Sequence, residues 1–224
     1  MADGTKAMRL RRALGDSEQK HPLLAIGAVN ALAAHVAAET GFDALWVSGL
    51  EVSAASGLPD ANVLGSRDLA DVVASLGRVT DLPVIVDIDN AGGSGRTAER
   101  FAYDLMCAGA AAVCVEDSAY PKCSSFAVHR AQTLADRDLL CEQVGRIRKL
   151  AGDGLVVVAR TEALIAGEDM GGPPALVGLV VGGMSSNRRN SPWKVSAPSH
   201  RARHSATVSS RRAKRLSHGS SDSV

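Results

Sequence analysis

Aromatic residues are scarce in this sequence. They make up 3% of the 224 residues, although 46% of the chain is hydrophobic. A core with so few rings has to be built from Ala, Val, Leu and Ile, and the abundance of small residues favours close contacts between helices and a sheet. The length suits one globular domain with a sizeable core, so the composition predicts an α/β protein.

Long apolar runs and paired cysteines are also lacking. No stretch approaches the roughly 18 apolar residues that span a bilayer, and the N-terminal segment has no apolar signal core. No CxxC pair occurs among the four cysteines, which are Cys107, Cys114, Cys123 and Cys141. We therefore expect free thiols, a cytoplasmic location and no membrane partner.

Charge is distributed unevenly along the chain. The net charge is +1, but residues 171–224 contain nine Lys and Arg and one acidic residue, Asp222. This segment is first Gly-rich and then rich in Ser and Arg, without hydrophobic periodicity, so we expect a disordered tail. The sequence thus divides into an N-terminal segment (1–21), a folded region (22–170) and a tail (171–224).

Three interpretations of the tail stay open. It is an out-of-frame translation of a G+C-rich gene, a functional basic tail, or part of a genuine short variant. A basic tail can attract nucleic acid or another acidic surface. Its charges are not interleaved with aromatic residues, however, and no folded surface presents them. We therefore do not expect nucleic acid as a partner.

Apolar runs alternate with helical patterns between residues 22 and 170. Continuous apolar runs are typical of strands buried on both faces, and they lie at 23–29, 44–49, 83–89, 111–117 and 155–160. Patterns that favour helices lie at 31–41, 66–79, 95–109 and 136–152. This repetition predicts parallel strands with right-handed crossovers. Five such units are too few to close an eight-stranded barrel, so a (β/α)8 barrel of TIM type would be incomplete here.

Polar residues gather where the predicted strands end. They are Ser48 and Gly49, Asp87 and Asp89, Glu116 and Asp117, and Arg160 and Glu162. In a (β/α) barrel the carboxyl ends of all strands meet at one mouth, where such enzymes carry out their chemistry. We therefore expect these residues to form one site.

Asp87 and Asp89 flank Ile88 at the end of a predicted strand. Alternation places both acids on one face and Ile88 on the other. Two carboxylates on one face repel each other unless a cation or a proton lies between them. A hard divalent ion such as Mg²⁺, which takes oxygen ligands, meets this need. Solvated loop acids or helix caps are the alternative.

Four blocks of sequence resemble the phosphoenolpyruvate mutase/isocitrate lyase superfamily. They are GFDALWVSGLEVSAASGLPD (41–60), VDIDNAGGSG (86–95), VEDSAYPKCSSF (115–126) and VVVARTEALIAG (156–167). They follow the family's order and spacing, and the resemblance covers about residues 22–170. Within the superfamily the blocks look closest to phosphoenolpyruvate mutases and phosphonopyruvate hydrolases.

The resemblance implies a Mg²⁺ cofactor and a small oxyacid substrate of the phosphoenolpyruvate or phosphonopyruvate class. Asp87 and Asp89 are the implied metal-site acids, with Glu116 as a partly water-mediated contributor. The implied substrate-binding residues are Trp46, Ser48, Gly49, Leu50, Ser125 and Arg160. Without the family, residues 48–50 would be an ordinary strand-to-loop turn. Family members are homo-oligomers, which we do not expect here because the C-terminal helices that subunits exchange are not found.

Three further residues are implied in catalysis, namely Asp60, Lys122 and Ser124. Asp60 matches an acid beside the transferring phosphoryl group, as a nucleophile or an orienter; a loop acid or helix cap is the alternative. Lys122 lies in the family's mobile gate and would neutralise phosphonate charge, unless it is a solvated loop Lys. Ser124 replaces a gate Asn that contacts the phosphonyl group.

Some positions depart from the family pattern. The usual DADTGYGN is here DIDNAGGSG, and the lyase loop KxCGH is here Lys122-Cys123-Ser124-Ser125. This argues against carbon–carbon lyase chemistry. Three further strands and a strand-six His are not found after Met170. We therefore expect a phosphoenolpyruvate mutase-like isomerase, with phosphonopyruvate hydrolase or a non-catalytic truncated product as alternatives.

Overall fold

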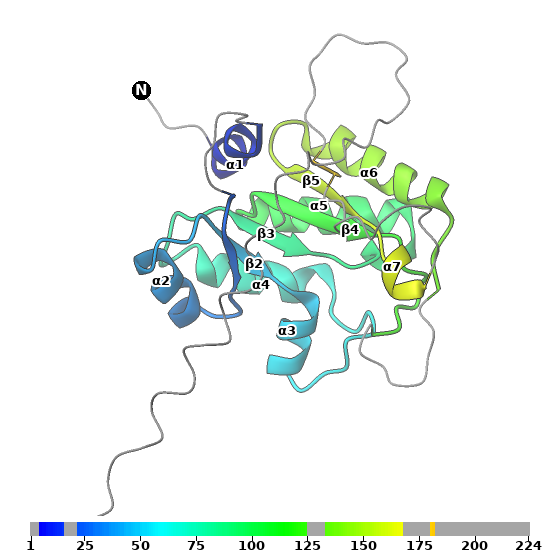
Figure 1. Cartoon of the computed structure of the whole chain (residues 1–224), viewed down its shortest axis with the longest axis horizontal. Helices are drawn as coiled ribbons and strands as arrows, with labels where there is room; N and C mark the ends of the chain where they lie inside the picture. The colour runs from blue at the N-terminus through cyan, green and yellow to red at the C-terminus, as the bar shows by residue number, and fades with distance from the viewer. Residues whose placement is uncertain (1–4, 16–21, 125–132, 168–179, 182–224) are drawn as a thin grey trace, which may run out of the picture. The chain divides into compact units, whose positions relative to one another are not determined.

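The computed structural model describes residues 5–15, 22–124, 133–167 and 180–181. Five parallel strands lie side by side in chain order, from blue to yellow in Figure 1. They are β1 (Ala25–Gly27), β2 (Ala44–Val47), β3 (Val84–Asp87), β4 (Ala112–Glu116) and β5 (Val156–Arg160). The chain has the parallel α/β architecture of the TIM-barrel type, and each strand falls within a predicted apolar run.

Four helices connect these strands and cover one face of the sheet. They are α2 (Ala31–Glu39), α4 (Ser66–Leu76), α5 (Gly95–Ala108) and α6 (Arg137–Ala151). The sequence predicts all four. Asn30, Ser94 and Asp136 begin three of them, and each side chain accepts a backbone N–H of the first turn. Helix α5 ends at Gly109, whose φ of 94° suits glycine.

Successive side chains along each strand point to opposite faces of the sheet. Residues such as Leu45, Val86, Val113 and Val157 point outward and pack in one core against the four covering helices. The intervening residues point to the opposite face, here called the inner face. Its lower part, here called the floor, is an apolar cluster that includes Trp46, Ile85, Ala112, Cys114, Val156 and Val158.

Helix α1 (Lys6–Gly15) lies in the N-terminal segment, for which no element is predicted. Its buried Leu10 joins the floor. Arg11 donates to the backbone carbonyl of Leu155 at 3.0 Å, and Arg9 donates to that of Asp81 at 2.8 Å. The helix thus packs where strands β3 and β5 begin, at the end opposite to α3 (Gly49–Ala55) in Figure 1.

Three short elements complete the description. They are η1 (Ala91–Gly93), α7 (Ala163–Ala166) and β6 (Val180–Val181). Strand β6 pairs antiparallel with β5. These two residues lie within the segment for which a disordered tail is predicted. The rest of that tail lies outside the described residues. Among the described residues, no helix is long and apolar enough to cross a membrane.

Candidate active site

Three buried carboxylates meet at the carboxyl ends of β3 and β4. Asp87 is the last residue of β3, and Glu116 is the last residue of β4. Asp89 follows two residues after Asp87, and its φ of 50° turns the chain back over the strand end. One oxygen from each carboxylate lies within 4.8 Å of the others. Ile88 packs in the outer core, so alternation does place both aspartates on the other face.

Arg160 closes one side of this acidic cluster. It is the last residue of β5 and pairs in register with Glu116. Its Nη1 lies 2.9 Å from Asp87 Oδ2, and its Nη2 lies 3.1 Å from Glu116 Oε2. Glu162, which is 2% exposed, accepts from Arg160 Nε at 2.5 Å. Because three carboxylates surround it, the guanidinium is held in one orientation.

Lys122 closes the other side. Its Nζ donates to Asp89 Oδ1 at 2.5 Å and to Asp60 Oδ1 at 3.1 Å. The Lys122 and Asp60 side chains are 5% and 7% exposed, respectively. These exposures argue against the alternatives of a solvated loop Lys and a solvated loop acid. The structure therefore brings Asp60 and Lys122 to the acidic cluster.

The acidic cluster holds protons more tightly than ordinary carboxyl groups do. Burial, followed by the charge of the neighbouring Asp87, raises the pKa of Asp89 to about 6. Burial raises the pKa of Glu116 to about 7, although Arg160 opposes this effect. The pKa of Asp87 is also raised, again mainly by burial. Burial alone would lower the pKa of Lys122, but its pairing with Asp89 raises it overall.

The charges of this site suit a divalent cation. Lys122 and Arg160 together contact five carboxylates, so negative charge exceeds the charge of these two cationic side chains. Both carboxylate oxygens of Glu116 are buried and accept no hydrogen bond of good geometry among the described residues. Mg²⁺ prefers a site in which all ligand atoms are oxygens and in which carboxylates provide an excess of negative charge. The residues present therefore fit the predicted metal.

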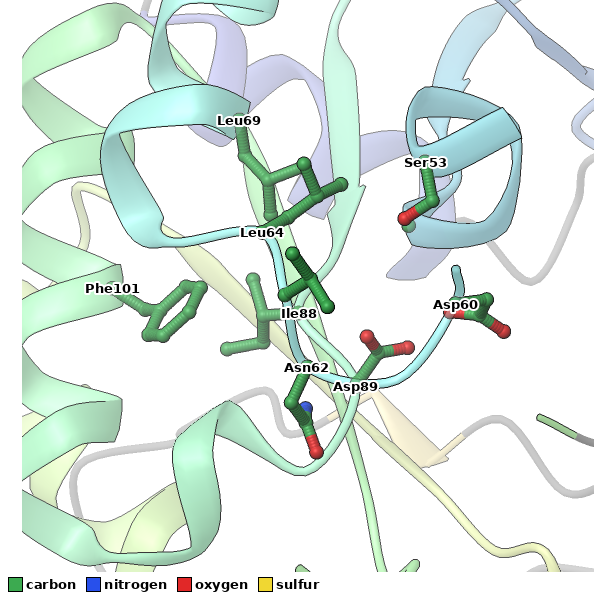
Figure 2. Close-up of a pocket in the computed structure, with 10 residues that line it drawn as sticks. Ser53, Asp60, Asn62, Leu64, Leu69, Ile88, Asp89 and Phe101 are labelled. Carbon is green, nitrogen blue, oxygen red and sulfur yellow. The ribbon is translucent and has the colours of Figure 1, made fainter. Parts of the chain in front are cut away.

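A cavity of about 10 Å³ lies beside the acidic cluster. Figure 2 shows its two sides, with Leu64, Leu69, Ile88 and Phe101 grouped together and the carboxylates of Asp60 and Asp89 apart from them. This volume is about that of one water molecule. The cavity thus lies between side chains of the outer core and the acids at the strand ends.

The predicted residues after β2 lie close to this cavity. Ser48 is the N-cap of α3, and its hydroxyl accepts the N–H of Glu51 at 3.4 Å. Gly49 lines the cavity. A Cβ at this position would lie 3.2 Å from Asp89 Oδ2, so glycine permits the close approach. Leu50 is in the first turn of α3 and is 37% exposed.

Three other predicted residues are placed less directly. Trp46 is on the inner face but packs in the floor with Ile85, one layer below the acids. Ser124 is half-buried at the end of the described loop. Ser125 lies outside the described residues. The geometry therefore gathers Asp60, Asp87, Asp89, Glu116, Lys122 and Arg160, together with Gly49.

Comparison with known proteins decides the family. The phosphoenolpyruvate phosphomutase family model matches residues 12–176. The chain belongs to this family. It is 39% identical to a 2-methylisocitrate lyase of Halalkalibacterium halodurans over 61% of the chain and 45% of the relative. It is also 39% identical to a phosphoenolpyruvate phosphomutase of Streptomyces hygroscopicus over 63% of the chain and 45% of that relative.

A solved structure of phosphonopyruvate hydrolase in complex with oxalate and Mg²⁺ is also similar. The identity is 31%, the TM-score is 0.65, and the match covers 74% of the chain and 56% of that protein. The chain thus spans about half the length of the relatives that it matches. Members of the superfamily that it resembles include lyases, mutases and hydrolases, so membership of the phosphomutase family does not fix one reaction.

Sequence reasoning missed a group of amides beside the site. Asn62 and Asn90 pair with each other, and Asn62 also binds the backbone of Lys122. Asn90 stands where the phosphomutase pattern DADTGYGN carries Thr. The asparagine substitution at that position was visible in the sequence and could have marked it as a residue with a hydrogen-bonding role.

Proposed function

We propose that this chain is a Mg²⁺-dependent phosphoenolpyruvate mutase-like isomerase that interconverts phosphoenolpyruvate and phosphonopyruvate. The observation that carries the proposal is the arrangement of Asp87, Asp89 and Glu116 within 4.8 Å, between the cationic groups of Lys122 and Arg160. Such a site is suited to substrates that carry several oxygen anions.

The reaction moves one phosphoryl group within a single molecule. The carbon–phosphorus bond of phosphonopyruvate breaks, and its electron pair stays on the enolate of pyruvate. The enolate oxygen then forms the new oxygen–phosphorus bond, so that no atom enters or leaves. The protein has to stabilise negative charge on both fragments and exclude water, which would otherwise take the phosphoryl group.

The three carboxylates would hold the metal. Asp87 and Asp89 are the proposed direct ligands, and Glu116 contributes partly through water. Bound Mg²⁺ would offset the excess of carboxylate charge and attract the oxygens of the substrate. With the metal bound, Asp89 would no longer need Lys122 to offset its charge, and the Lys122 ammonium would be available to the substrate.

The remaining residues would bind the two ends of the substrate. Arg160 presents a guanidinium that suits a carboxylate or phosphonate. Lys122 would neutralise the phosphoryl group, and Asp60, which pairs with it at 3.1 Å, would orient that ammonium. Gly49 and Leu50 would offer backbone N–H groups to the enolate oxygen. Trp46, Ser48, Ser124 and Ser125 are proposed to surround the substrate.

The gate loop supports a mutase or hydrolase rather than a lyase. Ser124 stands where the lyase pattern has Cys, and no Gly-His pair follows it. Phosphonopyruvate hydrolysis is the second candidate, because the chain resembles such a hydrolase at 31% identity and Ser124 replaces the mutase Asn. A non-catalytic product is the third, because the described sheet has five parallel strands where a closed TIM barrel has eight.

A ³¹P NMR time course separates these candidates. Phosphonopyruvate is incubated with the full chain and Mg²⁺, beside an Asp87→Ala variant and an Arg67→Ala control outside the site. The mutase predicts a phosphoenolpyruvate signal with the unchanged chain and the control only. Inorganic phosphate would support the hydrolase, and an unchanged phosphonopyruvate signal would contradict both enzymes.

A further inference from the structure

Two asparagine side chains join the loops that carry the site. Asn62 lies in the loop between α3 and α4, and Asn90 follows β3. Asn62 Nδ2 donates to Asn90 Oδ1 at 3.1 Å, and Asn90 Nδ2 donates back to Asn62 Oδ1 at 3.3 Å. Asn90 Nδ2 also donates to the carbonyl of Ala119, in the loop after β4, at 3.1 Å. This reciprocal pair connects three loops.

The pair also holds the backbone of Lys122. The backbone N–H of Lys122 donates to Asn62 Oδ1 at 2.6 Å. Asn62 has a φ of 57°, a left-handed conformation that Asn adopts more readily than most residues. The side chain that fixes the Lys122 backbone is thus presented from a turn that favours asparagine.

The network is anchored in a covering helix. Gln143 of α6 is 1% exposed, and its Nε2 donates to the backbone carbonyl of Asn90 at 2.8 Å. Asn90 itself is 2% exposed. Buried amides are costly unless they are hydrogen-bonded, and a satisfied network defines one arrangement of its members. The loop positions are therefore set by α6 through Asn90 and Asn62.

We propose that Asn62 and Asn90 are positioning residues that fix the backbone of Lys122 and thereby place its ammonium at Asp60 and Asp89. The Lys122 side chain reaches both carboxylates from a backbone N–H that Asn62 holds, and Asn90 holds Asn62 in turn. The role of this ammonium toward a substrate rests on the proposed function; the anchoring of the backbone does not.

The anchoring can be tested through the neighbouring thiol. Cys123 follows Lys122 and is half-buried, whereas Cys107 and Cys141 are exposed on α5 and α6. Alkylation by iodoacetamide, followed by peptide mass spectrometry, gives the rate at Cys123 with the two exposed thiols as internal references. Asn62→Gly keeps the backbone conformation, and Asn90→Ala removes the partner amide. Asn30→Ala, which removes an N-cap bond of α2 that is not part of this network, is the matched control.

In both test variants, iodoacetamide should label Cys123 about five- to ten-fold faster. The loss of one hydrogen bond raises the population of the locally open state by a factor of this size. Cys107 and Cys141 should be unchanged, and Asn30→Ala should leave Cys123 at the original rate. Asn62→Asp, which retains an acceptor for the Lys122 N–H, should restore most of the slow labelling. An unchanged Cys123 rate in both variants would overturn the proposal.

Kinetics separate this proposal from the proposed function. If the chain converts phosphonopyruvate, both variants should lower kcat about ten-fold or more while the Mg²⁺ affinity stays within about two-fold, because the metal acids are untouched. A loss of Mg²⁺ affinity equal to the loss of kcat would overturn the positioning role. Faster Cys123 labelling in a chain without turnover would support the anchoring and reject the proposed function.

Discussion

The inner face of the sheet has two layers that come from the same strands. One is the apolar floor, and the other is the ring of charged residues at the carboxyl ends of the strands, here called the mouth. On β4, Cys114 lies in the floor and Glu116 in the mouth; on β5, Val158 lies in the floor and Arg160 in the mouth. One step of two residues therefore changes an apolar cluster into an ionic one. Alternation decides which face a side chain takes, but depth along the strand decides whether that side chain builds the fold or the site.

The two layers also differ in what they contribute to stability. The floor buries apolar side chains, which stabilises the fold. The mouth buries carboxylates whose pKa values are raised, and a raised carboxyl pKa reflects a native state that disfavours the charge. The following tests break or sharpen this division.

A charge moved into the floor should have the largest effect. Val158→Asp places a carboxylate one layer below Arg160, where Val158 is 2% exposed. We expect a loss of about 4 kcal/mol or more, enough to unfold a marginally stable domain. Val158→Ala, the control, should lose only about 2 kcal/mol. Urea unfolding followed by circular dichroism measures both, and equal stability of the two variants would erase the distinction between the layers.

Removal of one charge from the mouth should act in the opposite direction. Glu116→Gln keeps the shape of a buried side chain without its charge, so the metal-free variant should be more stable at pH 8 than the unchanged chain. Its Mg²⁺ affinity should fall about ten-fold or more. Thermal unfolding with and without Mg²⁺ gives both quantities, with Glu142→Gln on the exposed face of α6 as the control. Unaltered Mg²⁺ stabilisation would remove Glu116 from the metal site.

The pH dependence should follow the same logic with a smaller effect. The folded chain takes up protons at Asp89 near pH 6 and at Glu116 near pH 7, above their ordinary values of 3.8 and 4.5. Stability of the metal-free protein should therefore rise as pH falls from 8 to about 5.5. Mg²⁺ should stabilise the protein more at pH 8 than at pH 5.5. A melting temperature that falls steadily over this range would contradict the raised pKa values.

Trp46 offers the smallest and finest test. The family resemblance predicts contact with substrate, whereas the structure packs Trp46 in the floor. If its role is packing, Trp46→Phe should cost about 1 kcal/mol of stability and leave KM within about two-fold. If Trp46 contacts the substrate, KM should rise by clearly more than two-fold. Steady-state kinetics beside thermal unfolding distinguish the two roles.

The sequence predicted the repeating parts of the fold and the ends of its strands. Apolar runs and helical patterns located β1 to β5 and the four covering helices, because burial on both faces leaves a strong periodic signal. Helix α3 and strand β6 were missed, since seven and two residues are too short to carry one. Helix α1 does carry Ala7 and Leu10 at helical spacing, so its pattern was available.

The site was predicted in part for a physical reason. Acids and bases at strand ends converge because the topology brings those ends together, so Asp87, Asp89, Glu116 and Arg160 could be grouped from the sequence. The contact between Lys122 and Asp60 depends on loop conformation across 62 residues, which no periodicity encodes. The Asn62–Asn90 pair also joins two loops, so no periodic pattern in the sequence predicts it either.

The docking of α1 bears on the order in which the chain folds. Arg11 contacts Asp153 and Leu155 across 142 and 144 residues of sequence. Contacts of such separation form slowly, because a long loop has to close first. During synthesis, α1 is made long before β5, so Leu10 can be fully buried only after β5 has been made. The beginning of the chain is therefore among the last parts to reach its final place.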